Sequence, residues 1–398
     1  MTPAGPGVST GPRLRVLLSV RPYLGHLHPL IPLARAFIRA GHSVAVASAE
    51  DVAGAVTATG LTWFPAGFNP REMQEIFPRD DPDYGRRVVK AKLEDLLDIC
   101  LGEFRPDVII REPTDLAPIL AAEILGALPV VYGISRFIPM SSWGYLGADE
   151  TITRLRKEYR LPEDPDLECF YRDLYIAVLP PFLEVRSPLP VPAVQHLRYI
   201  PWDGDTSGWE VEKPAGPDDR PTVLMTLGTV YNDYTDLFRS FIAALADEDL
   251  DVICTVGEDA DPSLFSSVPA NVRLERYRPH STILPRCQVT LCHGGFNTVM
   301  GSLMAGVPVI CVPLGSDHQY NADLCAEKGF GLTLTEGEAS PERIRQDVLR
   351  VLTEPSFANK VRALQKRLAT RPGPMTTVHR IEKLAARKRS GHDLLLRP

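Results

Sequence analysis

Residues 291–300, LCHGGFNTVM, place a histidine, two glycines and small polar residues between an apolar run and the start of an expected helix. Main-chain N–H groups converge at a helix start, and the helix dipole favours negative charge there. The stretch therefore predicts a site for a phosphate group. The other interpretation is a tight glycine turn beside a buried, satisfied histidine. The residues expected to contact the anion are His293, Gly294, Gly295, Asn297 and Thr298.

A second histidine, His26, lies in a loop between an apolar strand and an expected helix. An imidazole, whose ordinary pKa is about 6.5, can accept a proton from a hydroxyl group near neutral pH. Glu112 and Asp115 follow another expected strand, and so would lie at the same edge of a parallel sheet. Either carboxylate could accept a ring N–H and fix the tautomer of His26. The plainer alternatives are a surface histidine and acids that favour the start of a helix near Pro113.

Two further loops follow expected strands in the C-terminal half. Gly228 and Thr229 lie in one of them, and Asp317 and His318 lie in the other, just ahead of a helix. Adjacent polar side chains of this kind suit sugar hydroxyl groups, although Asp317 also suits a plain N-cap. We therefore expect these residues near the same ligand whose phosphate group would bind the turn within 291–300, which is called the phosphate turn from here on.

Aromatic residues gather in two segments of the N-terminal half, 68–85 and 137–182. Aromatic rings stack well on flat, apolar molecules, so both segments are candidate walls of a pocket for such a ligand. Burial in a local core is the alternative, and it is the commoner fate of such side chains. The candidate wall residues are Phe68, Phe137, Trp143 and Tyr145, together with Phe170, Tyr171 and Tyr175.

Neither a metal ion nor a dinucleotide cofactor is expected. The Asp-x-Asp pairs at 81/83, 164/166 and 203/205 lie in acidic turns that contain Pro or Gly, without a preceding strand to hold two carboxylates rigidly. We read them as solvated turns. The fingerprint G-x-G-x-x-G is missing after the first expected strand and at the phosphate turn, which argues against NAD or flavin.

The composition is that of an ordinary globular protein. The chain has 398 residues, 44% apolar and 23% charged, which suffices for two domains with separate cores. A net charge of −7, with only a short basic run at 387–389, argues against a nucleic-acid partner. Seven cysteines without a C-x-x-C pair indicate reduced thiols in a cytoplasmic protein. Apolar runs are too short to predict a membrane span.

Short apolar strands alternate with helices along both halves, which predicts α/β domains with parallel sheets. A linker at 204–220 collects Gly, Pro and Asp without periodicity. It separates an N-terminal domain (13–203), after a disordered leader (1–12), from a C-terminal domain (221–373) and a last helix (374–398) that could pack back on the first domain. Strands are expected at 14–20, 42–47, 61–64, 107–111, 129–132, 222–228, 251–256, 271–275, 288–292 and 308–312, and helices over 113–125 and 233–246, after 295 and after 317, with helical segments between 133 and 200.

Taken together, residues 14–385 resemble the nucleotide-sugar glycosyltransferases that decorate secondary metabolites, especially the actinobacterial antibiotic enzymes that use deoxysugar nucleotides. The resemblance implies the GT-B fold, in which two doubly wound Rossmann-like domains face each other across a cleft. The paired C-terminal motifs are specific at this spacing, whereas each alone is weak. The segments that carry the resemblance are GHLHP (25–29), 111–131, LPPFLEV, LRYIPWDG, TLGTV, YRPHSTILPRC (277–287), HGGFNT and DHQYNA.

The resemblance also implies a role for each matching residue. His26 would be the general base, and Glu112 would be its acid partner, where the family more usually has aspartate. Asp317 would contact the sugar, and His318 stands where glutamine is commonest. The nucleobase would lie near Tyr277, Arg278 and His280, and the diphosphate near His293, Gly294, Gly295, Asn297 and Thr298.

The function implied is an inverting, metal-independent glycosyltransferase. It would move a deoxysugar from a dTDP-sugar, with a UDP-sugar less favoured, to a hydroxyl group of a natural-product aglycone. Both partners are small molecules, without nucleic acid or stable membrane insertion, and a homodimer is one option. The alternatives are a non-catalytic nucleotide-sugar-binding activator of a partner transferase and a lipid-linked glycosyltransferase, whose basic membrane-facing patch the N-terminal half does not show. A Rossmann oxidoreductase lacks its glycine fingerprint.

Overall fold

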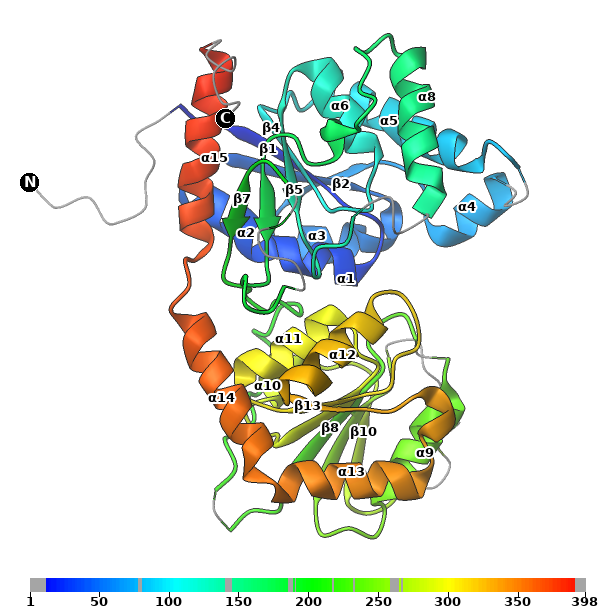
Figure 1. The fold of residues 1–398 in the computed structure, drawn as a ribbon, viewed down its shortest axis with the longest axis vertical. Helices are drawn as coiled ribbons and strands as arrows, with labels where there is room; N and C mark the ends of the chain where they lie inside the picture. Colours follow the sequence, from blue (N-terminus) through cyan, green and yellow to red (C-terminus); the bar gives the residue numbers. More distant parts are fainter. Residues whose placement is uncertain are drawn as a thin grey trace, which may run out of the picture. The chain divides into compact units, whose positions relative to one another are not determined.

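The structure is a computed structural model that describes residues 12–77, 81–139, 145–184, 189, 191–216, 218–231, 233–257, 265 and 268–390. The chain forms two compact units (Figure 1). One contains the described residues up to Tyr199 and those from Pro372 onward, and the other contains Ile200–Arg371. Residues 200–203 therefore belong with the second unit, four residues before the expected linker. The expected leader lies outside the described residues, except for residue 12.

The first unit is built on a seven-stranded parallel sheet with the strand order β3-β2-β1-β4-β5-β6-β7. The expected strands form because each is a short run of apolar residues buried on both faces. Val16, Leu17 and Leu18 of β1, for example, are fully buried. The strands are β1 (Arg15–Ser19), β2 (Ser43–Ser48), β3 (Thr62–Pro65), β4 (Val108–Arg111), β5 (Leu128–Tyr132), β6 (Tyr175–Ala177) and β7 (Val194–His196).

Helices cover this sheet. α5 packs against α6 and α8, and these helices share a core with Leu17 of β1 and Ile109 of β4. The last helix, α15, packs along α2, where Nε2 of the buried His42 lies 2.8 Å from Oε1 of Glu382 (Figure 1). The helices are α1 (Leu24–Leu27), α2 (Ile31–Arg39), α3 (Ala53–Ala58), α4 (Pro70–Ile76), α5 (Tyr84–Gly102), α6 (Ala117–Leu125), α8 (Ala148–Glu158) and α15 (Pro374–Arg389), with short 3-10 turns η1 (His28–Leu30), η2 (Glu50–Val52), η3 (Tyr145–Gly147) and η4 (Glu168–Phe170).

The second unit repeats the architecture with a six-stranded parallel sheet in the order β10-β9-β8-β11-β12-β13. Its strands are β8 (Thr222–Thr226), β9 (Asp251–Thr255), β10 (Val272–Glu275), β11 (Val289–Cys292), β12 (Val309–Cys311) and β13 (Gly331–Thr333). Its helices are α9 (Thr235–Leu245), α10 (His280–Ile283), α11 (Phe296–Ala305), α12 (His318–Lys328), α13 (Pro341–Thr353) and α14 (Pro355–Ala369), with the 3-10 turn η6 (Glu336–Glu338). The prediction of two α/β sheets of parallel strands is confirmed.

Two expectations about local structure are wrong. The helical segments expected between 133 and 200 include the strands β6 and β7, and α8 is the one α-helix in the described part of that region. A short apolar run such as YIAVL fits a buried strand as well as a helix, and here β5 offers it a partner. The helix expected from Pro113 begins at Ala117 instead, because residues 112–115 form a turn. No helix of the described residues is long and apolar enough to cross a membrane.

Candidate functional site

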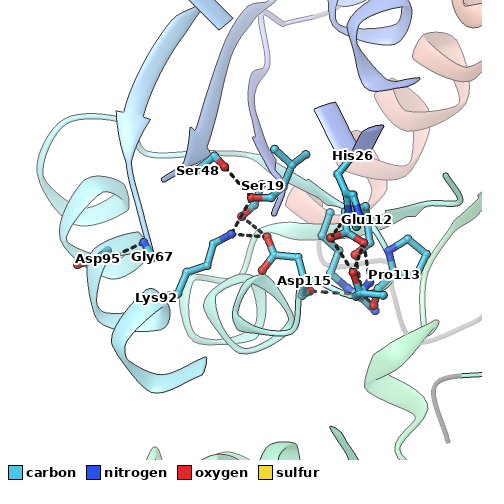
Figure 2. Close-up of polar contacts among 12 residues, drawn as sticks. Ser19, His26, Ser48, Gly67, Lys92, Asp95, Glu112, Pro113 and Asp115 are labelled. Atoms are coloured by element: carbon cyan, nitrogen blue, oxygen red, sulfur yellow. Dashed lines mark hydrogen bonds and ion pairs between the residues drawn. The ribbon is translucent and has the colours of Figure 1, made fainter. Parts of the chain in front are cut away.

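His26 and Glu112 lie together at the carboxyl edge of the first sheet. His26 follows β1, and Glu112 follows the neighbouring strand β4. Nδ1 of His26 lies 3.0 Å from Oε1 of Glu112 (Figure 2). The distance is that of an ion pair, although Nδ1 has no well-aligned hydrogen bond. The His26 side chain is 21% exposed and Glu112 is completely buried, so the imidazole stands between the carboxylate and the solvent.

The carboxylate of Glu112 is held by the turn that follows it. Oε2 accepts a 2.6 Å hydrogen bond from the main-chain N–H of Thr114, and the Thr114 hydroxyl donates to both oxygens at 2.8–2.9 Å. Burial raises the pKa of the acid, but the opposing effects of His26, Arg21 and the Thr114 N–H are larger together and bring it down to about 2. Glu112 is therefore a permanent anion behind the histidine.

The turn 112–115 is fastened from inside the protein. The main-chain N–H of Asp115 donates to the carbonyl of Glu112, and the buried guanidinium of Arg111 donates to the carbonyls of Glu112 and Pro113 at 3.1 and 2.8 Å. Asp115 is not the partner of His26. Its Oδ2 accepts hydrogen bonds from Ser19 and Lys92, both at 2.7 Å (Figure 2). Of the two acids that the sequence left open, Glu112 is the one placed beside the imidazole.

A cavity of about 500 Å³ is lined by Arg21 and Tyr23, which precede His26 in the chain, whereas His26 and Glu112 do not line it themselves. Tyr23 lines it, and the Tyr23 and His26 ring centroids are 5.5 Å apart. The walls come from the two segments that the aromatic residues indicated: α4 and the start of α5 on one side, η3 and α8 on the other. The lining is mixed, with two tyrosines, three arginines and apolar side chains such as Met73 and Leu146. Such a pocket is large enough for a drug-sized molecule.

The individual wall residues differ from those expected. Phe137 is buried in a small core with Tyr175, and Phe68 packs edge-on against Phe77; neither lines the cavity. Aromatic character alone does not distinguish a residue that lines a pocket from one that packs in a core, and Phe137 and Phe68 pack against other aromatic rings. Trp143 lies outside the described residues. Tyr145 begins η3, whose next two residues do line the cavity, but its own side chain is outside the description.

In the second unit, His293 directly follows β11, and its ring occupies space that two glycines leave open. A Cβ atom at Gly295 would lie 2.3 Å from Nε2 of His293, and one at Gly228 would lie 2.7 Å from Cε1. Gly228 and Gly294 also have positive φ angles, +74° and +84°, which favour glycine. Gly295 is the N-cap of α11 and supplies no side-chain cap, and a helix start of this kind can bind an anion through its main-chain N–H groups.

His318 packs against His293. Their ring centroids are 4.6 Å apart in an edge-to-face arrangement, and Tyr231 contacts His318 at 4.9 Å. His318 is only 4% exposed and packs beside the turn after β11, and its predicted contact with a sugar stays a prediction. Asn321, one turn farther along α12, donates to the carbonyl of Gly294 at 2.9 Å and to Asp317 at 3.1 Å.

Both histidines are held uncharged. Burial lowers the pKa of His293 to about 3, and the neighbouring His318 and His280 act in the same direction. Burial also lowers the pKa of His318, against the opposing effect of Asp317. The Nδ1 atoms of both rings are buried and have no hydrogen-bond partner among the described residues. Buried polar atoms of this kind call for a ligand or a water molecule.

The remaining residues predicted for the donor differ in their surroundings. Tyr277 donates through its hydroxyl to the carbonyl of Asp203, which ties it to the linker. Arg278 is buried, and its guanidinium contacts Glu212, Glu275, Thr282 and the carbonyl of Glu210, so it holds the linker against this unit. His280 begins α10, and its Nε2 lies near the hydroxyl of Thr255. Thr229 is exposed in the turn after β8. Asn297 and Thr298 lie in the first turn of α11.

The Asp-x-Asp turns are engaged in local contacts. Asp81 and Asp83 pair with arginines, Asp164 accepts from the main-chain N–H groups of residues 168 and 169, and Asp203 binds Ser281. Within the described ranges, no three His, Cys, Asp or Glu side chains are grouped so that they could hold a metal ion.

Acid should destabilise the second unit through His293. Its folded pKa of about 3 lies below the ordinary 6.5, so the unfolded chain binds the extra proton between these values. The free energy of unfolding should therefore fall as pH falls from 6.5, by up to about 1.4 kcal/mol per pH unit from this residue. His293→Gln should reduce the pH dependence of the free energy of unfolding, measured in urea, between pH 6.5 and 4.5. This pH range lies above the one in which Glu112 contributes. An unchanged slope would contradict the assignment of a buried neutral imidazole.

Known proteins share both the sequence and the fold. The family described as "Erythromycin biosynthesis protein CIII-like, C-terminal domain" matches residues 239–384. The chain is 30% identical to L-demethylnoviosyl transferase of Streptomyces niveus over 399 residues, 95% of this chain and 99% of that protein. Spinosyn forosaminyltransferase SpnP has a TM-score of 0.79 at 25% identity, over 94% of this chain and all of that one. Glycosyltransferase VinC in complex with dTDP has a TM-score of 0.71 at 27% identity, over 94% and 100%.

These similarities extend over nearly the whole chain and agree with its two parallel α/β sheets, which are those of the GT-B fold. The segments GHLHP, 111–131, TLGTV and HGGFNT, which carry the resemblance, lie at the carboxyl ends of β1, β4, β8 and β11. The chain belongs to the family of glycosyltransferases that attach sugars to antibiotics and related natural products.

Proposed function

We propose that the protein transfers a deoxysugar from a dTDP-sugar to a hydroxyl group of a natural-product aglycone, with inversion at the anomeric carbon and His26 as the general base. The observation that carries the proposal is the His26–Glu112 pair beside the 500 Å³ cavity. A UDP-sugar is the second choice of donor, because the similar transferase VinC binds dTDP. We place the reaction in the cytoplasm, in keeping with the seven free cysteines.

The His26–Glu112 pair, called the dyad from here on, supplies the base that the acceptor hydroxyl needs. A hydroxyl group is a poor nucleophile at neutral pH, so a base must take its proton as its oxygen bonds to C1 of the sugar. When Nδ1–H of His26 points to Glu112, the lone pair on Nε2 is the one that accepts this proton. The buried anion of Glu112 then stabilises the imidazolium that forms. Direct attack on the face opposite the leaving group inverts the anomeric centre.

The phosphate turn supplies the complementary half of the reaction. As the C1–O bond breaks, negative charge grows on the departing diphosphate, and the dipole and main-chain N–H groups at the N-terminus of α11 would stabilise it. The unsatisfied Nδ1 atom of His293 offers a further polar contact. We propose that these groups suffice without a divalent cation. Tyr277 and His280 would lie toward the nucleobase, and Asp317 toward the sugar.

The cavity between α4, α5, η3 and α8 is the proposed acceptor site. Its tyrosines and apolar side chains suit the faces of a flat aglycone, and its arginines suit the oxygen atoms at the edge of such a molecule. Its contact with Tyr23 brings a bound hydroxyl group toward His26.

His26→Ala should abolish transfer while the protein still binds dTDP. Loss of a general base typically costs about 10²–10⁴ in rate, whereas the diphosphate contacts belong to the other unit. The purified chain alone would be assayed with dTDP- and UDP-sugars against a panel of phenolic and macrolide aglycones, and dTDP binding would be measured by calorimetry. Turnover by the isolated wild-type chain separates an enzyme from an activator. A fully active His26→Ala variant would reject the base assignment.

Gly295→Ala should weaken dTDP binding by tenfold or more, because its Cβ must displace the His293 ring; tenfold corresponds to about 1.4 kcal/mol. Gly301→Ala is the matched control on the same helix. There the nearest atom to a new Cβ, Cδ1 of Leu284, is an ordinary 3.8 Å away. Calorimetric titration with dTDP distinguishes the two variants, and equal affinities for both would show that the His293 turn does not bind the donor.

Met73→Trp should raise the KM for the aglycone by about tenfold, because the larger side chain fills space inside the cavity. The donor KM should stay the same. Ile76→Trp, on the same helix but 48% exposed and outside the cavity lining, is the control. If the two substitutions affect the aglycone KM alike, the acceptor binds elsewhere.

A further inference from the structure

Lys92 and Asp115 form a buried ion pair a short distance from the dyad. Nζ of Lys92 lies 2.7 Å from Oδ2 of Asp115, and the two side chains are only 11% and 3% exposed (Figure 2). Removing two charges from water costs several kcal/mol per ion, and an apolar pair of similar volume is often as stable. The pair is therefore poorly explained by stability alone, and its neighbours indicate what else it does.

The neighbours are the ends of two strands. Ser19, the last residue of β1, donates to the same oxygen of Asp115 at 2.7 Å. Nζ of Lys92 also donates to the carbonyl of Val20 at 2.9 Å, and the hydroxyl of Ser48 at the end of β2 donates to that carbonyl at 3.0 Å. One ammonium group on α5 thus joins the end of β1 to the turn after β4 (Figure 2).

Both partners of the dyad leave from these anchored points. The short segment that leads from β1 into α1, the helix that carries His26, begins directly after Val20. Glu112 and Asp115 are the two ends of one turn, closed by the hydrogen bond from the N–H of Asp115 to the carbonyl of Glu112. The carboxylate of Asp115 is directed to Lys92, and that of Glu112 is directed to His26. A shift of this turn relative to β1 would change the distance between His26 and Glu112.

The stem of Lys92 has little freedom to move. Gly67 has a φ angle of +76°, and a Cβ atom there would lie 3.0 Å from Cδ and 3.2 Å from Cγ of Lys92. The N–H of Gly67 donates at 2.8 Å to Asp95, one turn farther along α5 (Figure 2). The chain after β3 therefore lies against the stem and limits the positions that the ammonium group can take.

We propose that Lys92 is a positioning residue for glycosyl transfer: through Asp115 and Val20 it fixes the turn that carries Glu112 relative to the segment after β1 that leads to His26 in α1. This inference rests on the proposed function of the dyad. Lys92 touches no reacting atom, and it acts on the rate through Glu112. Displacements of about 1 Å in a catalytic arrangement can cost up to about 10² in rate.

The first variant is Lys92→Met, which keeps the stem and removes the charge. We expect kcat to fall about 10- to 100-fold, with an unchanged donor KM because the donor contacts lie in the other unit. This variant also leaves the Asp115 carboxylate buried without its cation, which is destabilising. The double variant Lys92→Met/Asp115→Leu removes both charges and should recover thermal stability without recovering kcat. If stability and kcat recover together, Lys92 has a structural role only and the proposal is wrong.

Two comparisons show whether the effect passes through the dyad. In a Glu112→Gln background, Lys92→Met should lower kcat no further, because the group that it positions is already disabled; a full additional loss would overturn the proposal. Arg156→Met breaks another buried pair of this unit, with Glu123, and should lower stability while leaving kcat near the wild-type value. An active His26→Ala variant would instead refute the proposed function, so the two failures are distinguishable.

Discussion

The buried negative charge of Glu112 constrains the structure of the chain around it in the first unit. A carboxylate with no exposure to water would cost several kcal/mol if it were unpaired, so the surrounding chain must satisfy both of its oxygens. Thr114 does this with its N–H and hydroxyl, which requires residues 112–115 to form a turn before α6 can begin. The guanidinium of Arg111 donates hydrogen bonds to the carbonyls of Glu112 and Pro113 in that turn. The late start of the helix is thus a consequence of holding an anion behind His26.

The second unit meets the opposite requirement, because it keeps its histidines neutral. His293 and His318 pack edge-to-face with almost no exposure, and each would repel a charge on the other. Gly228, Gly294 and Gly295 leave room for these residues, because a Cβ atom at any of them would lie within 3 Å of His293 or His318. In the proposed reaction, Glu112 would stabilise positive charge on His26, whereas the start of α11 would stabilise negative charge on a departing group.

Local motifs predicted much of this from the sequence, because each is set by neighbours along the chain. The strand, glycine turn and helix around His293 are contiguous, and so are the strand and loop that lead to His26. Residues that act from a distance gave no such signal. Lys92 lies on a helix that carries several other charged residues, and its proposed role depends on Gly67, Val20 and Asp115 from three other segments. Aromatic character was also a weak signal, since a core and a pocket both select large rings: Phe137 and Phe68 pack against other rings and do not line the cavity.

The glutamate at position 112 shows how one extra methylene group is accommodated. An aspartate at the end of β4 would carry its carboxylate closer to the main chain, whereas Glu112 has an additional rotatable bond whose freedom must be removed. Three hydrogen bonds from Thr114 fix that longer side chain, and Oε1 still lies 3.0 Å from Nδ1 of His26. Thr114 is useful here because its hydroxyl and its own N–H converge on the same group. The length of the acid and the identity of the residue two positions later are therefore one structural feature, and a change at either position alters the dyad through the other.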